Sequence, residues 1–124
     1  MLDHLQRRIV ETLAEAHSVT LATYGPASIQ AHVFPCEAQS GALYILVPRT
    51  SDHLFNIENH PSVVATTERW QVYGAAEALP MCPAGLALGG RPDAAWSAVV
   101  RLIPVRLHIA PTGPAGCSET IDVL

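Results

Sequence analysis

The chain changes from strand to helix within one run, Arg49-Thr50-Ser51-Asp52-His53-Leu54-Phe55-Asn56-Ile57-Glu58-Asn59-His60-Pro61. The apolar residues 43–47 before it predict a β-strand, and Pro61 ends the short helix that the run itself predicts. Arg49, Thr50 and Ser51 therefore reach a helix N-terminus, where backbone N–H groups, hydroxyls and a guanidinium can converge on one phosphate. Ser51 can equally be no more than the N-cap of the helix, with Asp52 favoured by the helix dipole. The two interpretations are compatible, because a capping hydroxyl can also face a ligand.

The residues on either side of this run predict an antiparallel β protein. Apolar residues spaced three and four apart over residues 2–16 indicate an amphipathic helix. Residues 80–92 contain three prolines and three glycines and predict a loop, and Pro104 predicts an edge or a bulge in the last strand. Segments rich in β-branched and apolar residues predict six strands, at residues 18–24, 27–35, 42–47, 62–67, 70–79 and 98–109. This order describes a small antiparallel barrel with helical plugs.

The composition indicates one domain that associates with a second copy of itself. A chain of 124 residues fits a single domain, which we place at residues 1–110, followed by a Pro/Gly-containing C-terminal tail at residues 111–124 that we expect to be loosely held. Only 15% of the residues are charged and 49% are hydrophobic, so part of the surface is expected to be buried in a homodimer. The net charge of −4 and the scattering of the 7 Lys and Arg residues argue against nucleic-acid binding.

The cysteines and histidines favour a cytoplasmic protein without a metal centre. Cys36, Cys82 and Cys117 lie far apart with no CxxC spacing, which is typical of reduced thiols in a cytosol. No apolar run approaches the roughly 20 residues that span a bilayer, and the N-terminus has no secretory pattern, so we expect no membrane partner. The six histidines show no HxH, HxxxH or HExxH spacing, so we expect no bound zinc.

Four short pieces, in the right order, resemble the pyridoxamine 5'-phosphate oxidase-like FMN-binding split-barrel superfamily over about residues 5–110. The first is Leu21-Ala22-Thr23 before a glycine turn, and the second is Leu43-Tyr44-Ile45 leading into Arg49-Thr50-Ser51-Asp52-His53. The third is the helix end with Asn56, Ile57, Asn59 and Pro61, which resembles the N-L-x-x-x-P of the family. The fourth is Val72-Tyr73-Gly74-Ala75-Ala76-Glu77, which resembles its V-x-G-x-A strand. The resemblance implies a mainly β fold with minor α, namely a six-stranded antiparallel split β-barrel with an N-terminal helix and a short helix after strand three.

The resemblance also implies a homodimer with FMN at the subunit interface. The loop residues Arg49, Thr50 and Ser51, with His53, would hold the phosphate. The second strand would run along the isoalloxazine mainly through its backbone, and the start of the partner's fifth strand would complete the site. These two strands contribute Gln30, Ala31, His32, Val33, Arg69, Trp70 and Gln71. The implied function is that of a flavin-dependent oxidoreductase acting on an unidentified small-molecule substrate, in which no residue stands out as a general acid or base.

Two of these residues also have simpler interpretations. Strand alternation puts His32 on one face with Gln30 and Phe34, where a histidine is more often packed or at an interface than catalytic. Trp70 is a core residue by default, although its place at the start of the partner-facing strand favours a position beside the flavin.

Two positions depart from the family pattern, since many members carry a basic residue in place of Asp52 and a lysine in place of His53. Loss of a fixed cation beside a dianionic phosphate should weaken FMN binding. A histidinium at position 53 would restore part of that charge below about pH 6.5. A Ser-Asp-His version of the loop is similar to a branch related to haem-utilisation proteins. The alternative hypothesis is therefore a non-enzymatic protein of the same fold that has lost FMN and serves in ligand or haem binding or sensing.

Overall fold

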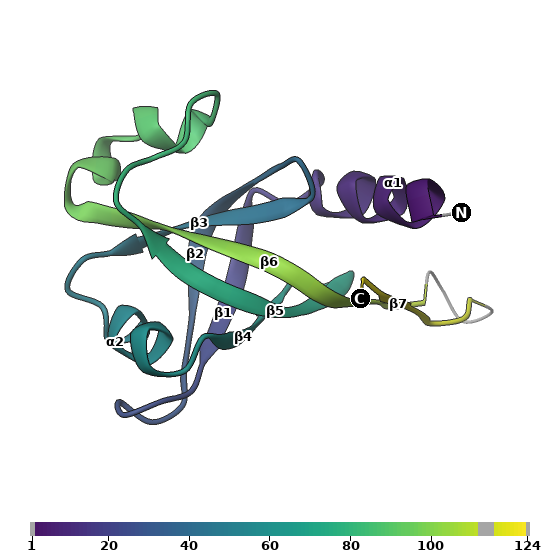
Figure 1. The fold of residues 1–124 in the computed structure, drawn as a ribbon, viewed down its shortest axis with the longest axis horizontal. Coiled ribbons are helices and arrows are strands. Elements are labelled where there is room, and N and C mark those ends of the chain that lie inside the picture. The colour runs from purple at the N-terminus through teal and green to yellow at the C-terminus, as the bar shows by residue number, and fades with distance from the viewer. Residues whose placement is uncertain (1, 112–115, 124) are drawn as a thin grey trace.

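The computed structural model describes residues 2–111 and 116–123 and confirms the predicted fold class (Figure 1). The strands are β1 (Ser18–Thr23), β2 (Gln30–Gln39), β3 (Ala42–Pro48), β4 (Ser62–Thr66), β5 (Trp70–Leu79), β6 (Ser97–Ile109) and β7 (Glu119–Asp122). The helices are α1 (Leu2–Leu13), α2 (Asp52–Asn59) and two 3₁₀ turns, η1 (Ala87–Gly90) and η2 (Pro92–Trp96). The strands follow the order β3-β2-β1-β4-β5-β6, and β3 also pairs with β6, which closes a six-stranded antiparallel barrel. Among the described residues, none of the helices has the length and apolarity to cross a membrane.

Strand β3 is buried on both faces, which explains its unbroken apolar sequence. Leu43, Ile45 and Val47 point into the barrel core. The alternate residues, among them Tyr44 and Leu46, pack beneath the segment that carries η1 and η2. A strand covered on both sides has a continuous apolar sequence, and β3 leads directly into the loop before α2.

A bulge in the β5–β6 pair lies at the position that Pro104 predicted. The register shifts between Tyr73 and Gly74, so that Gly74 faces Pro104 while Tyr73 faces Arg106. A Cβ on Gly74 would lie 2.2 Å from the carbonyl oxygen of Ile103, so this close approach requires glycine.

Strand β2 changes partners along its length. Its first part, Gln30 to Pro35, pairs with β1, whereas only Cys36 to Gln39 pair with β3. On its other edge β3 pairs with β6, from Leu43 to Pro48. Among the described residues, no strand therefore covers the edge of β2 that faces away from β1 over residues 30–35. This open edge is the split in the barrel.

The tail differs from the sequence prediction of a loosely held segment. β7 pairs with β6 from Arg106 to Ile109, and Ile121 is buried. Helix α1 lies at the same end of the barrel (Figure 1), and Arg8 contacts Glu119 with a nitrogen–oxygen distance of 2.8 Å. Helix α2 lies at the opposite end. Residues 112–115 and 124, which also belong to the predicted tail, lie outside the described residues.

Candidate anion loop and histidine pair

The loop between β3 and α2 is anchored by its own backbone. The amide of Arg49 donates to the carbonyl oxygen of Trp96 at 3.0 Å, and the amide of Ser51 donates to that of Pro48 at 3.0 Å. The Nε atom of Arg49 donates to the carbonyl oxygen of Ser97 at 3.3 Å, while the residue as a whole stays exposed. The guanidinium is thus positioned by one bond and keeps its remaining donors for a ligand.

Ser51 caps helix α2, as its sequence position predicted. Its Oγ atom accepts a hydrogen bond from the amide of His53 at 3.1 Å, and Asp52 follows in the first turn. A serine hydroxyl that accepts one bond still has a proton to donate. The cap therefore leaves Ser51 able to donate outward, next to the exposed Thr50.

The side chain of His53 turns inward and is 1% exposed. Its Nδ1 atom lies 2.8 Å from Oγ1 of Thr23, and its Nε2 atom lies 2.8 Å from Nδ1 of His32. Both ring nitrogens are thus used inside the protein, so the direct contact between His53 and a phosphate that the sequence predicted is not available. The ring does not face solvent either.

The pKa of His53 also argues against a role for this residue in anion binding. Burial lowers its pKa most, nearby His32 lowers it further, and Asp52 raises it in part. A histidinium at position 53 is therefore less available to supplement the anion loop than the ordinary histidine pKa implies. Arg49 is the cation that this loop offers.

Thr23 and Asn56 belong to the same buried cluster, and sequence reasoning gave neither of them a role. Asn56 is fully buried, and its Nδ2 atom donates to Oγ1 of Thr23 at 3.1 Å and to the carbonyl oxygen of Ser28 at 2.9 Å. The spacing of His53, Asn56 and Ile57 is the i, i+3, i+4 pattern of a buried helix face. That spacing was the available signal, and the polar character of two of its members concealed it.

The predicted flavin-facing residues lie along the open edge of β2. Ala31, His32 and Val33 are exposed, and Gln30 donates from Nε2 to the carbonyl oxygen of Ala27 at 2.8 Å. The ring of Phe34 packs edge-on against that of His53, with centroids 5.3 Å apart. The structure therefore brings two predicted parts of the site together, since the His32–His53 contact joins β2 to the first turn of α2.

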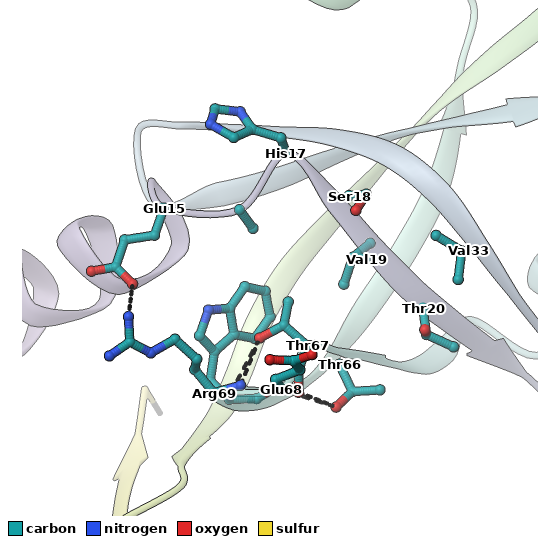
Figure 2. A pocket seen from close by; sticks show the side chains of 12 residues that line it. Glu15, His17, Ser18, Val19, Thr20, Val33, Thr66, Thr67, Glu68 and Arg69 are labelled. Atoms are coloured by element: carbon teal, nitrogen blue, oxygen red, sulfur yellow. Dashed lines mark hydrogen bonds and ion pairs between the residues drawn. The ribbon is translucent and has the colours of Figure 1, made fainter. Parts of the chain in front are cut away.

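The third predicted group, Arg69, Trp70 and Gln71, does not join the loop within one chain. It lies at the β4–β5 turn, beside the start of β1, whereas the loop lies beyond its end. A hollow of about 700 Å³ lies there, and Val33 of β2 also lines it. Arg69 contacts Glu15 across its rim at 3.8 Å, and Figure 2 shows the side chains that line it. Trp70 is 3% exposed and packs in the core, which confirms its simpler interpretation for the single chain. The Gln71 side chain contacts the hydroxyl of Tyr73.

Arg49 borders two further hollows. One, of about 570 Å³, is also lined by Glu58 and Glu77, whose carboxylates oppose an anion. The other, of about 660 Å³, is lined by Arg91 and by apolar residues of the β5–β6 connection. By charge alone the Arg91 side favours an anion, although Asp93 lies 3.1 Å from Nε of Arg91, whereas Ser51 lines the hollow on the Glu58 side. Sequence reasoning missed Arg91 because nothing local places the loop that carries it beside β3.

Within the described residues, no three His, Cys, Asp or Glu side chains gather in a way that could hold a metal ion.

Comparison with known proteins identifies the fold through structure and not through sequence. No protein-family model and no curated protein matches the chain. General Stress Protein 26 from Bacillus anthracis str. Sterne superposes with a TM-score of 0.66 at 16% identity, over 96% of this chain and 98% of that one. A Listeria innocua protein named after pyridoxamine 5'-phosphate oxidase gives 0.65 at 12% identity, over 85% and 97%. A heme binding protein from Mycobacterium smegmatis gives 0.67 at 15% identity, over 95% of this chain and 57% of that one.

These similarities show the fold. The chain has the split-barrel fold of these solved structures, one of which is named after pyridoxamine 5'-phosphate oxidase. Proteins of this fold are named for different ligands and roles, so the function has to be argued from the site.

Proposed function

We propose that this protein binds FMN and acts as a flavin-dependent oxidoreductase on a small-molecule substrate. The observation that carries the proposal is the contact between Nδ1 of His32 and Nε2 of His53 at 2.8 Å. It holds the open edge of β2 beside the N-terminal turn of α2, next to Arg49. A phosphate position and an uncovered strand edge thus adjoin, as a ligand with a phosphate tail and a flat ring requires.

The residues present fit FMN, with fewer cations than the family pattern supplies. The guanidinium of Arg49 and the hydroxyls of Thr50 and Ser51 would hold the phosphate, while Asp52 would oppose it. The uncovered peptide groups of residues 30–35 would bond the polar edge of the isoalloxazine. When bound, the flavin supplies transfer of a hydride or of single electrons. The protein's part is to hold the ring and leave one face open to substrate.

We further propose that the protein is a homodimer, because one face of the sheet is apolar and uncovered. This apolar face extends over β1, β4, β5 and β6. Its cross-strand pairs are Ala22 with Val64, Val64 with Tyr73, and Ala75 with Ile103. Tyr73, Ile103 and Val105 are 40%, 47% and 40% exposed. A second copy on this face would bury them, and its β4–β5 turn could then supply the Arg69 group to the anion loop.

A cytoplasmic location also belongs to the proposal. Cys36, Cys82 and Cys117 are all free thiols. Burial raises the pKa of the Cys36 thiol to about 12, so this cysteine is an inert core residue.

Titration of the purified protein with FMN tests the proposal. The fluorescence of FMN is expected to fall when it binds to the protein. Arg49→Ala should weaken binding by roughly 1.5–3 kcal/mol, because a charge-assisted contact to the phosphate is lost. Arg7→Ala on α1 is the matched control and should leave the affinity unchanged. Protein that stays colourless and ignores added FMN would contradict the proposal.

A second candidate function is non-enzymatic binding of haem or another ligand. The inward turn of His53 favours it, because the loop then keeps one cation beside an exposed Asp52. A structural neighbour is named as a heme binding protein. Addition of haemin in place of FMN tests the haem form of this candidate: a Soret band that shifts on mixing supports it, whereas an unshifted band rejects haem as the ligand.

A further inference from the structure

A chain of four hydrogen-bonded side chains runs from the core to the open edge of β2. It begins at Asn56, passes through Thr23 and His53, and ends at His32. The first three residues are buried, and the last is exposed. Each step is 3.1 Å or shorter, so the four groups form one connected network.

The orientation of Asn56 sets the direction of this network. Its Oδ1 atom accepts from the amide of Ala27 at 2.9 Å, and its Nδ2 atom donates to the carbonyl oxygen of Ser28 at 2.9 Å. A backbone amide can only donate and a carbonyl can only accept, so the amide group cannot be reversed. The second Nδ2 proton therefore goes to Oγ1 of Thr23.

The same order of donor and acceptor continues from Thr23 to His53. Its hydroxyl oxygen accepts from Asn56, and at 3% exposure its own proton needs an acceptor. Nδ1 of His53, at 2.8 Å, is the acceptor that the described residues offer. His53 is neutral because burial lowers its pKa, so its single ring proton is on Nε2 and is donated to Nδ1 of His32.

We propose that His32 is held as the neutral tautomer with its proton on Nε2, and that it donates this hydrogen bond to an acceptor atom of the ligand along the open edge of β2. The ligand class is a flat heteroaromatic with a carbonyl oxygen or an unprotonated ring nitrogen at its edge. This ligand assignment rests on the proposed function, in which the ligand is a flavin. His32 is the binding residue, and Asn56, Thr23 and His53 are positioning residues that act through it.

The arrangement also determines what His32 does not do. Its lone pair is on Nδ1 and is engaged by His53, while Nε2, across the ring, carries a proton. The residue therefore presents a donor where a metal or a haem iron would need a lone pair. This separates the inferred role from haem ligation through the same side chain.

Nitrogen NMR of the histidine rings in the intact protein at pH 7.5 tests the tautomer. Both His32 and His53 should show a protonated Nε2 and an unprotonated Nδ1, whereas the exposed His17 should show exchange between tautomers. Thr23→Val should abolish the fixed pattern, and Thr23→Ser, which retains the hydroxyl, should preserve it. A protonated Nδ1 on His32 in the unaltered protein would overturn the inference, whatever the stability of the variants.

FMN titration tests the role of the donor. His32→Leu should weaken binding roughly tenfold, because a hydrogen bond to the ring is lost. His32→Gln, whose amide can donate, should retain most of the affinity. Equal affinity of His32→Leu and the unaltered protein would overturn the ligand role. If the unaltered protein binds no FMN, the proposed function fails, and the nitrogen spectrum by itself supports or overturns the donor assignment.

Discussion

The side-chain oxygen of Asn56 accepts a hydrogen bond from the amide of Ala27 at 2.9 Å, so helix α2 holds the loop between β1 and β2. The same side chain donates to Thr23 and Ser28. One amide group therefore positions the helix, the end of β1 and the entrance to β2 relative to one another.

Replacement of Asn56 by alanine should destabilise the protein by about 3 kcal/mol, because the buried hydroxyl of Thr23 and two part-buried backbone groups lose their partner. The free energy of unfolding in urea measures this. Asn59→Ala is the control, since Asn59 lies on the same helix, is exposed and bonds only the carbonyl oxygen of Phe55 among the described residues. It should change stability by no more than about 0.5 kcal/mol. Similar losses in both variants would show that Asn56 has no special role.

Gly74→Ala should also destabilise the fold, by about 2–4 kcal/mol, because its Cβ would lie 2.2 Å from the carbonyl oxygen of Ile103. Gly90→Ala is the matched control, because a Cβ there meets no atom within 4 Å. Thermal or urea unfolding compares the two. Equal stability would mean that the β5–β6 bulge yields at little cost.

The stability of the protein should fall as the pH drops below about 6.5, because the folded state lowers the pKa of His53. Above that pH, His53 is neutral in both states and its contribution is complete. As the pH falls, the unfolded chain binds the proton first, so the free energy of unfolding decreases until the folded-state pKa is passed. Urea titrations between pH 8 and pH 5 measure this slope. It should be smaller in His53→Gln, and an unchanged slope would assign the effect to other groups.

Ile103→Glu should convert a dimer to monomers, because it places a charge in the proposed interface. Ile103 is 47% exposed, so the folded monomer should keep its stability. Sedimentation velocity gives the oligomeric state. Met81→Glu, at a residue that is 76% exposed in the β5–β6 connection, should leave the dimer intact. A protein that is monomeric without any substitution would rule out the interface.

Local patterns predicted most of the fold. The buried β3, the Ser51 cap and the bulge at Pro104 each depend on a few neighbouring residues, so the sequence could reveal them. The pairing of β7 with β6 was missed because it joins distant segments and the four residues of β7 carry little signal.

The site was less predictable, since its chemistry depends on which way side chains turn. The resemblance predicted that His53 helps to hold a phosphate, whereas in the structure its ring contacts Thr23 of β1 and His32 of β2. Those partners lie 30 and 21 residues away in the sequence, so no local pattern contains them. The adjacency of β2 and the loop was instead implied by the resemblance to the split-barrel fold, which does not depend on the direction of single side chains.

The change of partner along β2 makes the length of that strand as important as its composition. His32 must face His53 from the part paired with β1, and Cys36 must face the core from the part paired with β3. Because strand side chains alternate, inserting or deleting one residue between them would turn one of the two to the wrong side. Substitutions in this interval leave the spacing intact, whereas a change of one residue in length would separate the histidine pair from the barrel that supports it.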